Sequence, residues 1–245
     1  MDKLNLIRAK DGVNVYRGLH NGWPAIAKYF EREADRREIL NYQILARHEI
    51  PTLAVFAVSE SSLVLEDINH SGTWRLGVEE DFYDVDVARA LAGWYFALHE
   101  KGSAAPELAD LYFEYDSITV ENLEKLTKKL PEGAKVLRLL LSHFGQLQKL
   151  IETPPFVLTY NDFHWTNLAV CKDKKAAMMF DYNMMGRGYR CSDLRNVCSL
   201  LSAKTGGVFM EEYGRLLAEK HDCCLKGLTK VEERGLMRYY RRFLR

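Results

Sequence analysis

The 245-residue sequence lacks several features that would place it in a simple class of protein. Neither charge is in excess, since 34 Lys and Arg residues balance 34 Asp and Glu residues, and this balance gives no reason to expect nucleic acid as a partner. No apolar run approaches the roughly 18 residues of a membrane-spanning helix. The first residues, MDKLNLIRAKDG, have no apolar core of the kind found in secretory signals. A cytoplasmic protein with no membrane span is therefore expected.

The cysteines lack the spacing of a metal site. They form an odd set with no C-x-x-C pair: Cys171, Cys191, Cys198, Cys223 and Cys224. His221 lies close to the last two, but no second pair of ligands follows at zinc-site spacing. Free thiols in a reducing compartment are the simpler interpretation.

Common nucleotide-binding loops are also missing. There is no Walker-type G-x-x-x-x-G-K sequence. The segment GRGYRC at 186–191 stands between a strand-like and a helix-like segment, as a dinucleotide fingerprint would. However, Cys191 replaces the third glycine and no βαβ unit surrounds the segment, so a flexible loop is the preferred interpretation.

The pattern of apolar residues predicts an α+β protein with two lobes. In the first third, strands are expected at 13–18, 23–30, 53–60 and 61–68, with one helix at 31–49 that ends near Pro51. Helices dominate afterwards, at 85–102, 121–130, 134–151 and 193–201, and two more follow near the C-terminus. The hinge is expected in LVLEDINHSG, which divides a β-rich N-lobe (residues 1–67) from a larger, mainly helical C-lobe (residues 68–245).

One polar loop stands out among strand-like segments. In LTYNDFHWTNLAV, residues 158–170, Asp162 and Asn167 have the Asp-x-x-x-x-Asn spacing of a kinase catalytic loop. Such a loop supplies a carboxylate for the attacking hydroxyl and one oxygen ligand for Mg²⁺. A second carboxylate, Asp181, follows a short hairpin and can face the same metal ion. The sequence therefore predicts phosphoryl transfer.

These segments resemble the aminoglycoside phosphotransferase and choline kinase-like enzymes, small-molecule relatives of protein kinases. YNDFHWTNLAV is similar to their His-Gly-Asp-x-His-x-x-Asn loop, with Tyr160 in place of the first His. MMFDYNMMGRGYRCSDLRNV resembles their second metal-binding segment with its trailing Asp. Weaker similarity covers DGVNVYRG, AIAKYF, RREILNYQIL, SLVLEDI and ALAGWYFALHEKG, and so extends over most of the chain. The resemblance implies the bilobal protein kinase-like fold.

The resemblance also implies a role for individual residues. Asp162 would be the catalytic carboxylate, and Asn167 and Asp181 would hold Mg²⁺. The nucleotide, ATP or GTP, would be bound by residues of the N-lobe and hinge: Gly12 of the degenerate phosphate loop, Lys28, its partner Glu38, Glu66 and Ile68. His164 and Asp193 would support the catalytic loop.

Several assignments remain open at this point. Glu33 competes with Glu38 as the partner of Lys28. His99, at the end of a helix, is expected to be a core or capping histidine. The basic segment LMRYYRRFLR is expected to pack as a helix with a solvated outer face.

An acidic run follows the hinge. EEDFYD and the next carboxylate place five acids together: Glu79, Glu80, Asp81, Asp84 and Asp86. They fit either a solvated helix start, which the helix dipole favours, or a lip that attracts a cationic acceptor.

We therefore expect an Mg²⁺- and ATP-dependent kinase that phosphorylates a hydroxyl of a small molecule such as an aminoglycoside, a choline-like compound or a sugar. One alternative is a nucleotide-binding pseudokinase with a regulatory role, although the mapped positions retain competent residues. The other is a kinase of a lipid-linked sugar or of proteins; the absence of an Ala-Pro-Glu segment after Asp181 argues against the protein kinase form.

Overall fold

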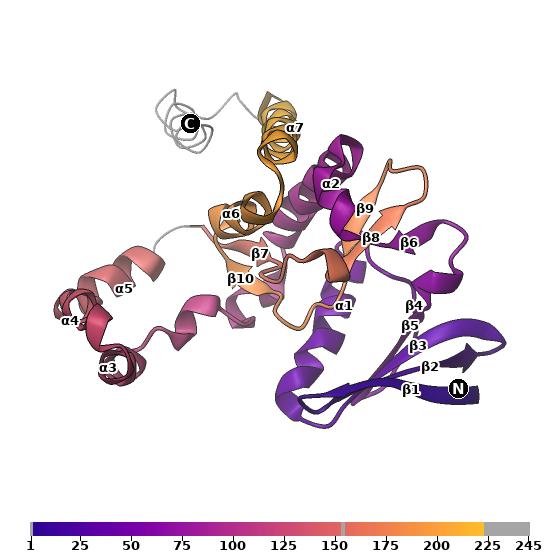
Figure 1. Ribbon diagram of the computed structural model, residues 1–245, viewed down its shortest axis with the longest axis horizontal. Helices are drawn as coiled ribbons and strands as arrows, with labels where there is room; N and C mark the ends of the chain where they lie inside the picture. Colours follow the sequence, from indigo (N-terminus) through magenta and orange to yellow (C-terminus); the bar gives the residue numbers. More distant parts are fainter. Residues whose placement is uncertain (1, 153–154, 223–245) are drawn as a thin grey trace.

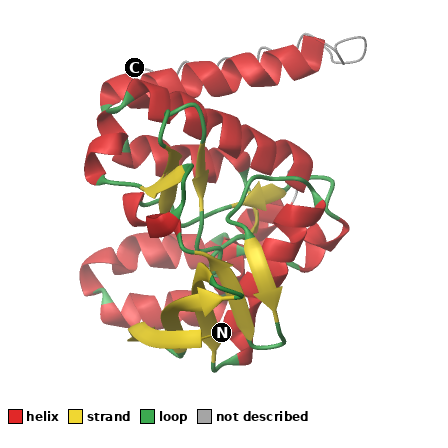
Figure 2. Ribbon diagram, turned by 90° about the vertical axis from the view of Figure 1, so that its right-hand side faces the viewer, coloured by secondary structure: helices red, strands yellow, loops and turns green. Residues whose placement is uncertain are grey.

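The computed structural model describes residues 2–152 and 155–222. Figure 1 shows a twisted sheet and one helix at the N-terminal end of the chain, and a larger helical part beyond the hinge. Figure 2, turned by 90°, shows the N-lobe strands gathered at one end and helices filling the other. The α+β, two-lobed organisation predicted from the sequence is confirmed.

The N-lobe is a five-stranded antiparallel sheet in the order β1-β2-β3-β5-β4. Two tight turns join its first three strands, and both carry residues with positive φ: Asp11 and Gly12 in the first, Asn21 and Gly22 in the second. Positive φ at both central residues is typical of the two-residue hairpin turn that matches strand twist. The strands are β1 (Asp2–Lys10), β2 (Val13–His20), β3 (Trp23–Phe30), β4 (Val55–Val58) and β5 (Ser62–Glu66).

Helix α1 (Arg37–Arg47) covers the inner face of this sheet, after a short 3₁₀ turn, η1 (Glu33–Arg36). Its buried side recurs at helical spacing, through Ile39, Tyr42 and Leu45, and joins the main hydrophobic core. Glu38 is also buried, although it is charged. A buried carboxylate requires a partner, and this one lies on β3.

The C-lobe is built around α2 (Val85–Gly102), which packs along α7 (Ala203–Asp222) and against short strands on either side of the polar loop at 160–167. Those strands form a pair, β7 (Val157–Thr159) with β10 (Gly186–Gly188), and a three-stranded sheet, β6 (Trp74–Leu76), β8 (Leu168–Cys171) and β9 (Ala177–Met179). Helix α6 (Arg190–Leu200) lies next to β7.

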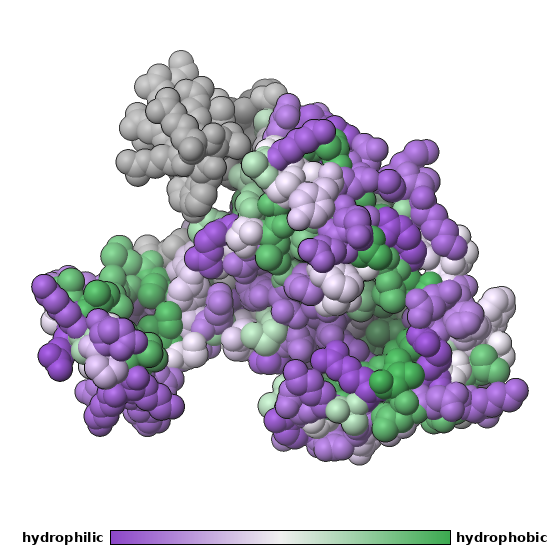
Figure 3. Space-filling view, in the orientation of Figure 1, coloured by the Kyte–Doolittle hydropathy of each residue, from purple (hydrophilic) through white to green (hydrophobic). Residues whose placement is uncertain are grey.

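Three further helices project from the body of the C-lobe (Figure 1). They are α3 (Val120–Lys129), α4 (Ala134–Ser142) and α5 (Phe144–Glu152). Apolar side chains on this projection are exposed to solvent, as the visible face in Figure 3 shows; Val136, Leu139 and Leu150 are each more than 60% exposed.

The structure corrects several sequence-based boundaries. Strand β1 was not predicted, and neither were the three-residue strands β6 and β10. The single helix predicted at 134–151 is wrong, because the chain breaks at His143 into α4 and α5. The helix predicted at 31–49 begins instead with η1. Cys223, Cys224 and the basic segment LMRYYRRFLR lie outside the described residues. Within the described residues, no helix is both long and apolar enough to cross a membrane.

Candidate active site

The polar loop between β7 and β8 holds Asp162 and Asn167 side by side. The Asn167 Nδ2 group donates a hydrogen bond to Asp162 Oδ2 at 2.8 Å. The short 3₁₀ turn η7 (Trp165–Asn167) brings the two residues together, and His164 caps this turn by accepting a hydrogen bond from the Thr166 amide at Nδ1 (3.3 Å). His164 is exposed, so it supports the loop locally.

Asp193 holds the start of the same loop from α6. Its Oδ2 atom accepts a hydrogen bond from the Tyr160 amide at 2.8 Å, and its Oδ1 atom accepts one from the Asn161 amide at 3.0 Å. The Asp193 side chain is 1% exposed. Because the buried carboxylate can only accept, these two amides fix the backbone immediately before Asp162. The structure thus brings Asp193 to the loop that it was expected to support.

The Asp193 carboxylate is tied in turn to α2 and α7. His99, on α2, has Nε2 3.1 Å from Asp193 Oδ2 and Nδ1 2.7 Å from the Tyr213 hydroxyl. Burial lowers the pKa of His99, which keeps the ring neutral with one donor and one acceptor nitrogen. Asp193 accepts from Nε2, so Nδ1 accepts from Tyr213. The Tyr213 hydroxyl accepts from Arg190 at 2.6 Å, which completes a directional chain of hydrogen bonds.

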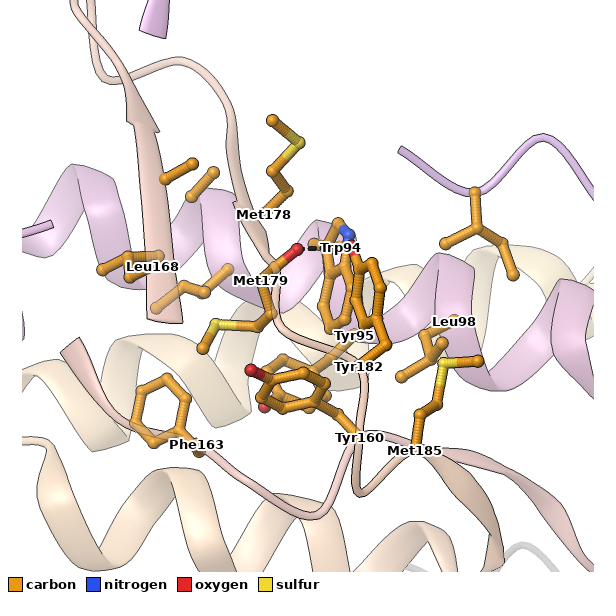
Figure 4. Packing of buried hydrophobic residues seen from close by; sticks show 14 of the residues in the cluster. Trp94, Tyr95, Leu98, Tyr160, Phe163, Leu168, Met178, Met179, Tyr182 and Met185 are labelled. Atoms are coloured by element: carbon orange, nitrogen blue, oxygen red, sulfur yellow. Dashed lines mark hydrogen bonds between the residues drawn. The ribbon is translucent and has the colours of Figure 1, made fainter. Parts of the chain in front are cut away.

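Tyr160 fills the position where the family pattern has His. Its ring is fully buried among aromatic side chains, with Trp94 at 5.8 Å and Tyr182 at 5.9 Å between ring centroids (Figure 4). Its hydroxyl donates to the Phe180 carbonyl at 2.5 Å. The larger side chain therefore links the catalytic loop to the residue that precedes Asp181.

Asp181 follows β9, which ends at Met179, and has a left-handed backbone conformation with φ of 65°. Its Oδ1 atom lies 2.9 Å from Lys28 Nζ, and the same Nζ lies 2.7 Å from Glu38 Oε1. The structure therefore selects Glu38 over Glu33, which is exposed in η1, as the partner of Lys28. Burial alone would lower the pKa of Lys28, but the carboxylates of Glu38 and Asp181 outweigh burial and raise it. Lys28 is therefore a permanent cation.

The negative charge of Asp181 acts on Asp162. Burial, followed by the negative charge of Asp181, raises the pKa of Asp162 above its ordinary value. Two carboxylates facing one region favour a cation between them. Asp181 uses Oδ1 for Lys28 and Asn167 uses its amide nitrogen for Asp162, so each side chain retains one oxygen.

This donor set fits Mg²⁺. Within the described residues, no group of three or more His, Cys, Asp or Glu side chains is gathered for a metal ion. A dedicated all-protein cage is not expected, because Mg²⁺ is usually bound by one or two protein oxygens together with substrate phosphates and water. Asn167 and Asp181 are the residues that would hold it.

Gly12, Glu66 and Ile68 were also predicted to contact the nucleotide, and the structure shows where each of them lies. Glu66 ends β5, and its Oε1 atom accepts a hydrogen bond from the Ala54 amide at 3.0 Å. Ile68 is buried at the start of the next 3₁₀ turn, η2 (Ile68–His70). Gly12 lies in the β1–β2 turn, where its carbonyl accepts from the Glu31 amide at 2.9 Å. The nucleotide-binding roles of Gly12, Glu66 and Ile68 stay predictions.

Two asparagines at the site were missed by sequence reasoning. Asn41, buried in α1, donates to the Tyr182 carbonyl at 2.7 Å, and Asn161 donates to the Met184 carbonyl at 3.1 Å. Both fix the segment that follows Asp181. A polar residue on the buried face of the predicted helix was the available signal for Asn41, whereas Asn161 could not be separated from its polar neighbours.

The acidic run after the hinge is mostly neutralised within the C-lobe. Asp81 makes a bidentate pair with Arg75 at 2.6 and 2.7 Å, and Asp84 caps α2 by accepting from the amide of Asp86 at 2.8 Å. The Asp84 carboxylate also pairs with Lys174 at 2.6 Å. These contacts favour the helix-start interpretation over an acidic lip.

The GRGYRC segment has a packing role. A Cβ atom at Gly186 would lie 1.9 Å from the Tyr112 carbonyl oxygen, and one at Gly188 would lie 2.7 Å from Thr159 Oγ1. Both glycines belong to β10, so this is a strand against β7 and not the flexible loop that was expected. Close backbone approach explains the glycines without a dinucleotide.

Comparison with known proteins agrees with this geometry. The profile of the family described as "Phosphotransferase enzyme family" matches residues 11–226. The chain belongs to this family. No curated protein matches the sequence. The resemblance to aminoglycoside phosphotransferases and choline kinase-like enzymes is confirmed.

Solved structures share the fold at low sequence identity. A choline/ethanolamine kinase family protein from Mesorhizobium loti is 16% identical, with a TM-score of 0.61, and the match covers 86% of this chain and 68% of that one. Spectinomycin phosphotransferase APH(9)-Ia, in complex with ADP and spectinomycin, is 14% identical, with a TM-score of 0.60 and coverage of 86% and 74%. Plasmodium vivax ethanolamine kinase is 14% identical, with a TM-score of 0.58 and coverage of 87% and 68%.

Proposed function

We propose that this protein transfers the γ-phosphoryl group of ATP to a hydroxyl of a small molecule. The observation that supports this most strongly is one constellation formed by distant segments. Asp162 and Asn167 share a hydrogen bond on the catalytic loop, and Lys28 bridges Glu38 and Asp181 across the two lobes. Phosphoryl transfer depends on positioning and on charge stabilisation, and these side chains supply both.

Each residue has a defined task in this proposal. Asp162 accepts or orients the proton of the attacking hydroxyl, and its raised pKa brings its proton affinity closer to neutral pH. Lys28, held by Glu38, neutralises the nucleotide phosphates. Asn167 and Asp181 hold Mg²⁺, which supplies positive charge to the phosphates when it is bound. Residues 1–67 form the nucleotide lobe, and residues 68–245 carry the loop and the acceptor site.

The acceptor belongs to the class of small hydroxylated metabolites. Solved proteins with the same fold bind spectinomycin or are described as choline or ethanolamine kinases, which supports an acceptor of this size. A cationic acceptor remains a prediction, and the neutralised carboxylates of Asp81 and Asp84 give it little support. GTP as an alternative donor and a cytoplasmic location also stay predictions.

The main rival is a pseudokinase that binds nucleotide without turnover. The intact set of Asp162, Asn167, Asp181, Lys28 and Glu38 disfavours it. To test the proposal, the purified protein is incubated with Mg²⁺, ATP and pools of hydroxylated metabolites, and ADP formation is measured. Acceptor-dependent ADP release that is lost in Asp162→Asn is expected. Nucleotide binding without ADP release in any pool would favour the pseudokinase.

A second rival is a kinase of a lipid-linked sugar. It is separated from the small-molecule kinase by adding detergent-solubilised lipid-linked sugars as one further pool. Activity confined to that pool would establish the rival.

A further inference from the structure

The inner face of the N-lobe sheet carries a row of cationic side chains that no sequence motif indicated. Arg8 on β1 is opposite Val15 on β2, and Val15 is opposite Lys28 on β3. In the adjacent row, Lys10 is opposite Val13. Directly paired residues of antiparallel strands project from the same face. Arg8 and Lys10 therefore project on the face that presents Lys28.

These cations line one pocket. It is bounded by Arg8 and Lys10 from β1, by Lys28 from β3, and by Asp181 from the C-lobe. Neighbouring strands lie about 4.8 Å apart, so the Arg8 backbone is roughly 10 Å from that of Lys28, a span that a long guanidinium side chain can cover. The pocket thus includes the side chain that neutralises phosphate and the carboxylate that holds the metal ion.

The turn above this pocket cannot act as a glycine-rich phosphate loop. Asp11 and Gly12 form a two-residue turn with φ of 53° and 83°, and the Gly12 carbonyl is tied to the Glu31 amide. A phosphate loop works by aiming several consecutive amides at the anion. Here the tip has room for only two central residues, and one of them, Asp11, brings a carboxylate to the pocket wall.

The charge at the base of the pocket is also insufficient for a polyphosphate. Two cations line this part of the pocket: Lys28, which Glu38 and Asp181 already contact, and Arg37, whose guanidinium lies 4.6 Å from the centroid of the Tyr112 ring. At the rim, Arg32 is paired with Asp35 at 2.7 Å. In contrast, Arg8 forms no ion pair with any residue that the structure describes, and Lys10 has only a loose one, 3.8 Å from Asp11.

We infer that Arg8 and Lys10 bind the nucleotide phosphates through their side chains, in place of the backbone amides that a glycine-rich loop would supply. The ligand is a nucleoside di- or triphosphate, and its anionic chain is held between Lys28 and the two cations of β1. Arg8 is the stronger contact, because Lys10 shares its charge with Asp11. The inference rests on the proposed kinase function, since the same pocket would serve ATP.

Calorimetry on the full chain tests this inference with ADP and Mg²⁺, and with adenosine as the probe that lacks phosphate. We expect Arg8→Gln to weaken ADP binding about threefold, Lys10→Gln to weaken it less, and the double variant to weaken it about tenfold, as befits solvent-exposed charge pairs. Adenosine affinity should not change. Raising the salt concentration should weaken ADP binding more in the wild type than in the double variant.

Lys3→Gln is the matched control, because Lys3 lies on the same strand, is exposed and does not line the pocket. It should leave ADP affinity unchanged. ADP affinity in the double variant equal to that of the wild type, or an equal loss in Lys3→Gln, would overturn the inference while leaving the kinase proposal intact. An equal loss for adenosine would show a structural defect and would also overturn it. A wild type that binds neither ADP nor ATP would overturn the proposed function as well.

Discussion

The two halves of the active site are built in opposite ways. Around the catalytic loop, Asp193, His99 and Tyr213 are buried and joined by hydrogen bonds of 2.7 to 3.1 Å. On the nucleotide side, β1 is exposed along its whole length, and its charged side chains have few partners. The loop that carries Asp162 is therefore fixed by the fold, whereas the side chains of β1 are free to contact the proposed nucleotide. Preorganisation at the reacting group is the arrangement that lowers the barrier for transfer.

The largest effect is expected from Asp162→Asn, which removes the proton acceptor but keeps the shape and the contact with Asn167. Acceptor-dependent ADP formation should fall by about 100-fold or more, since positioned acid–base groups typically contribute that much. The affinity for Mg²⁺ and ADP, measured by calorimetry, should stay close to the wild-type value. Turnover near the wild-type rate would exclude Asp162 as the base.

The second largest effect is expected from Asp193→Asn, which tests the half of the active site around the loop of Asp162 that the fold holds in place. The two carboxylate oxygens of Asp193 together accept hydrogen bonds from two backbone amides and His99, so the NH₂ group that replaces either oxygen would face a donor. We expect kcat to fall about tenfold or more and the free energy of unfolding to drop by about 2–4 kcal/mol. Asp173→Asn, at an exposed turn, is the control and should change neither. Unchanged kcat in a folded Asp193 variant would show that the loop does not depend on α6.

The junction of the two halves is tested by Lys28→Ala, Glu38→Ala and the double variant. Each change should raise KM for ATP. Lys28→Ala should lower kcat/KM about tenfold, and Glu38→Ala should lower it by a smaller factor. The losses should not add, because Glu38 acts through Lys28, to which it is joined at 2.7 Å. Glu33→Ala is the control and should resemble the wild type. If the losses in kcat/KM of the two single variants add fully in the double variant, Glu38 does not act through Lys28.

The smallest effect concerns the pH dependence of stability. Burial holds the pKa of His99 below its ordinary value of 6.5, so the unfolded chain binds the proton more tightly than the folded one. The stability that depends on neutral His99 is therefore present above about pH 6.5 and is lost progressively as the pH falls from the unfolded pKa towards the lower folded pKa.

His99→Gln removes this titration and retains one donor and one acceptor group. The free energy of unfolding is measured by denaturant titration at pH 7.5 and at pH 5.5. It should decrease between these pH values in both proteins, and the decrease should be smaller in the variant by about 1 kcal/mol. His143→Gln, at an exposed position, should follow the wild type. Identical pH dependence in the His99 variant would contradict this account, because it would mean that folding does not change the pKa of His99.

The sequence predicted the residues around the loop of Asp162 better than those on the nucleotide side of the active site. Asp162, Asn167 and Asp181 are near one another in the sequence. Loops between adjacent strands bring residues at such short separations close together in space. The bond between His99 and Tyr213 joins residues 114 positions apart, so only the packing of α2 on α7 creates it. No periodicity could indicate that pairing.

Strand β1 was missed for a different physical reason. It lies at the sheet edge with all its residues exposed, so its sequence is not forced to alternate between apolar and polar side chains. The break at His143 was missed because the apolar spacing on both sides of it remains helical. Consequently the cations of β1 could be located on the inner face only from the strand register.

Amide hydrogen exchange with and without Mg²⁺ and ADP tests the contrast between the two halves most directly. The amides of Tyr160 and Asn161, bonded to the buried Asp193 carboxylate, should exchange slowly in the free protein and should change little when the nucleotide is added. The amides of β1 and the β1–β2 turn should exchange rapidly without ligand and gain protection with it. Rapid exchange at Tyr160 and Asn161 that slows only on nucleotide binding would contradict a catalytic loop fixed by the fold.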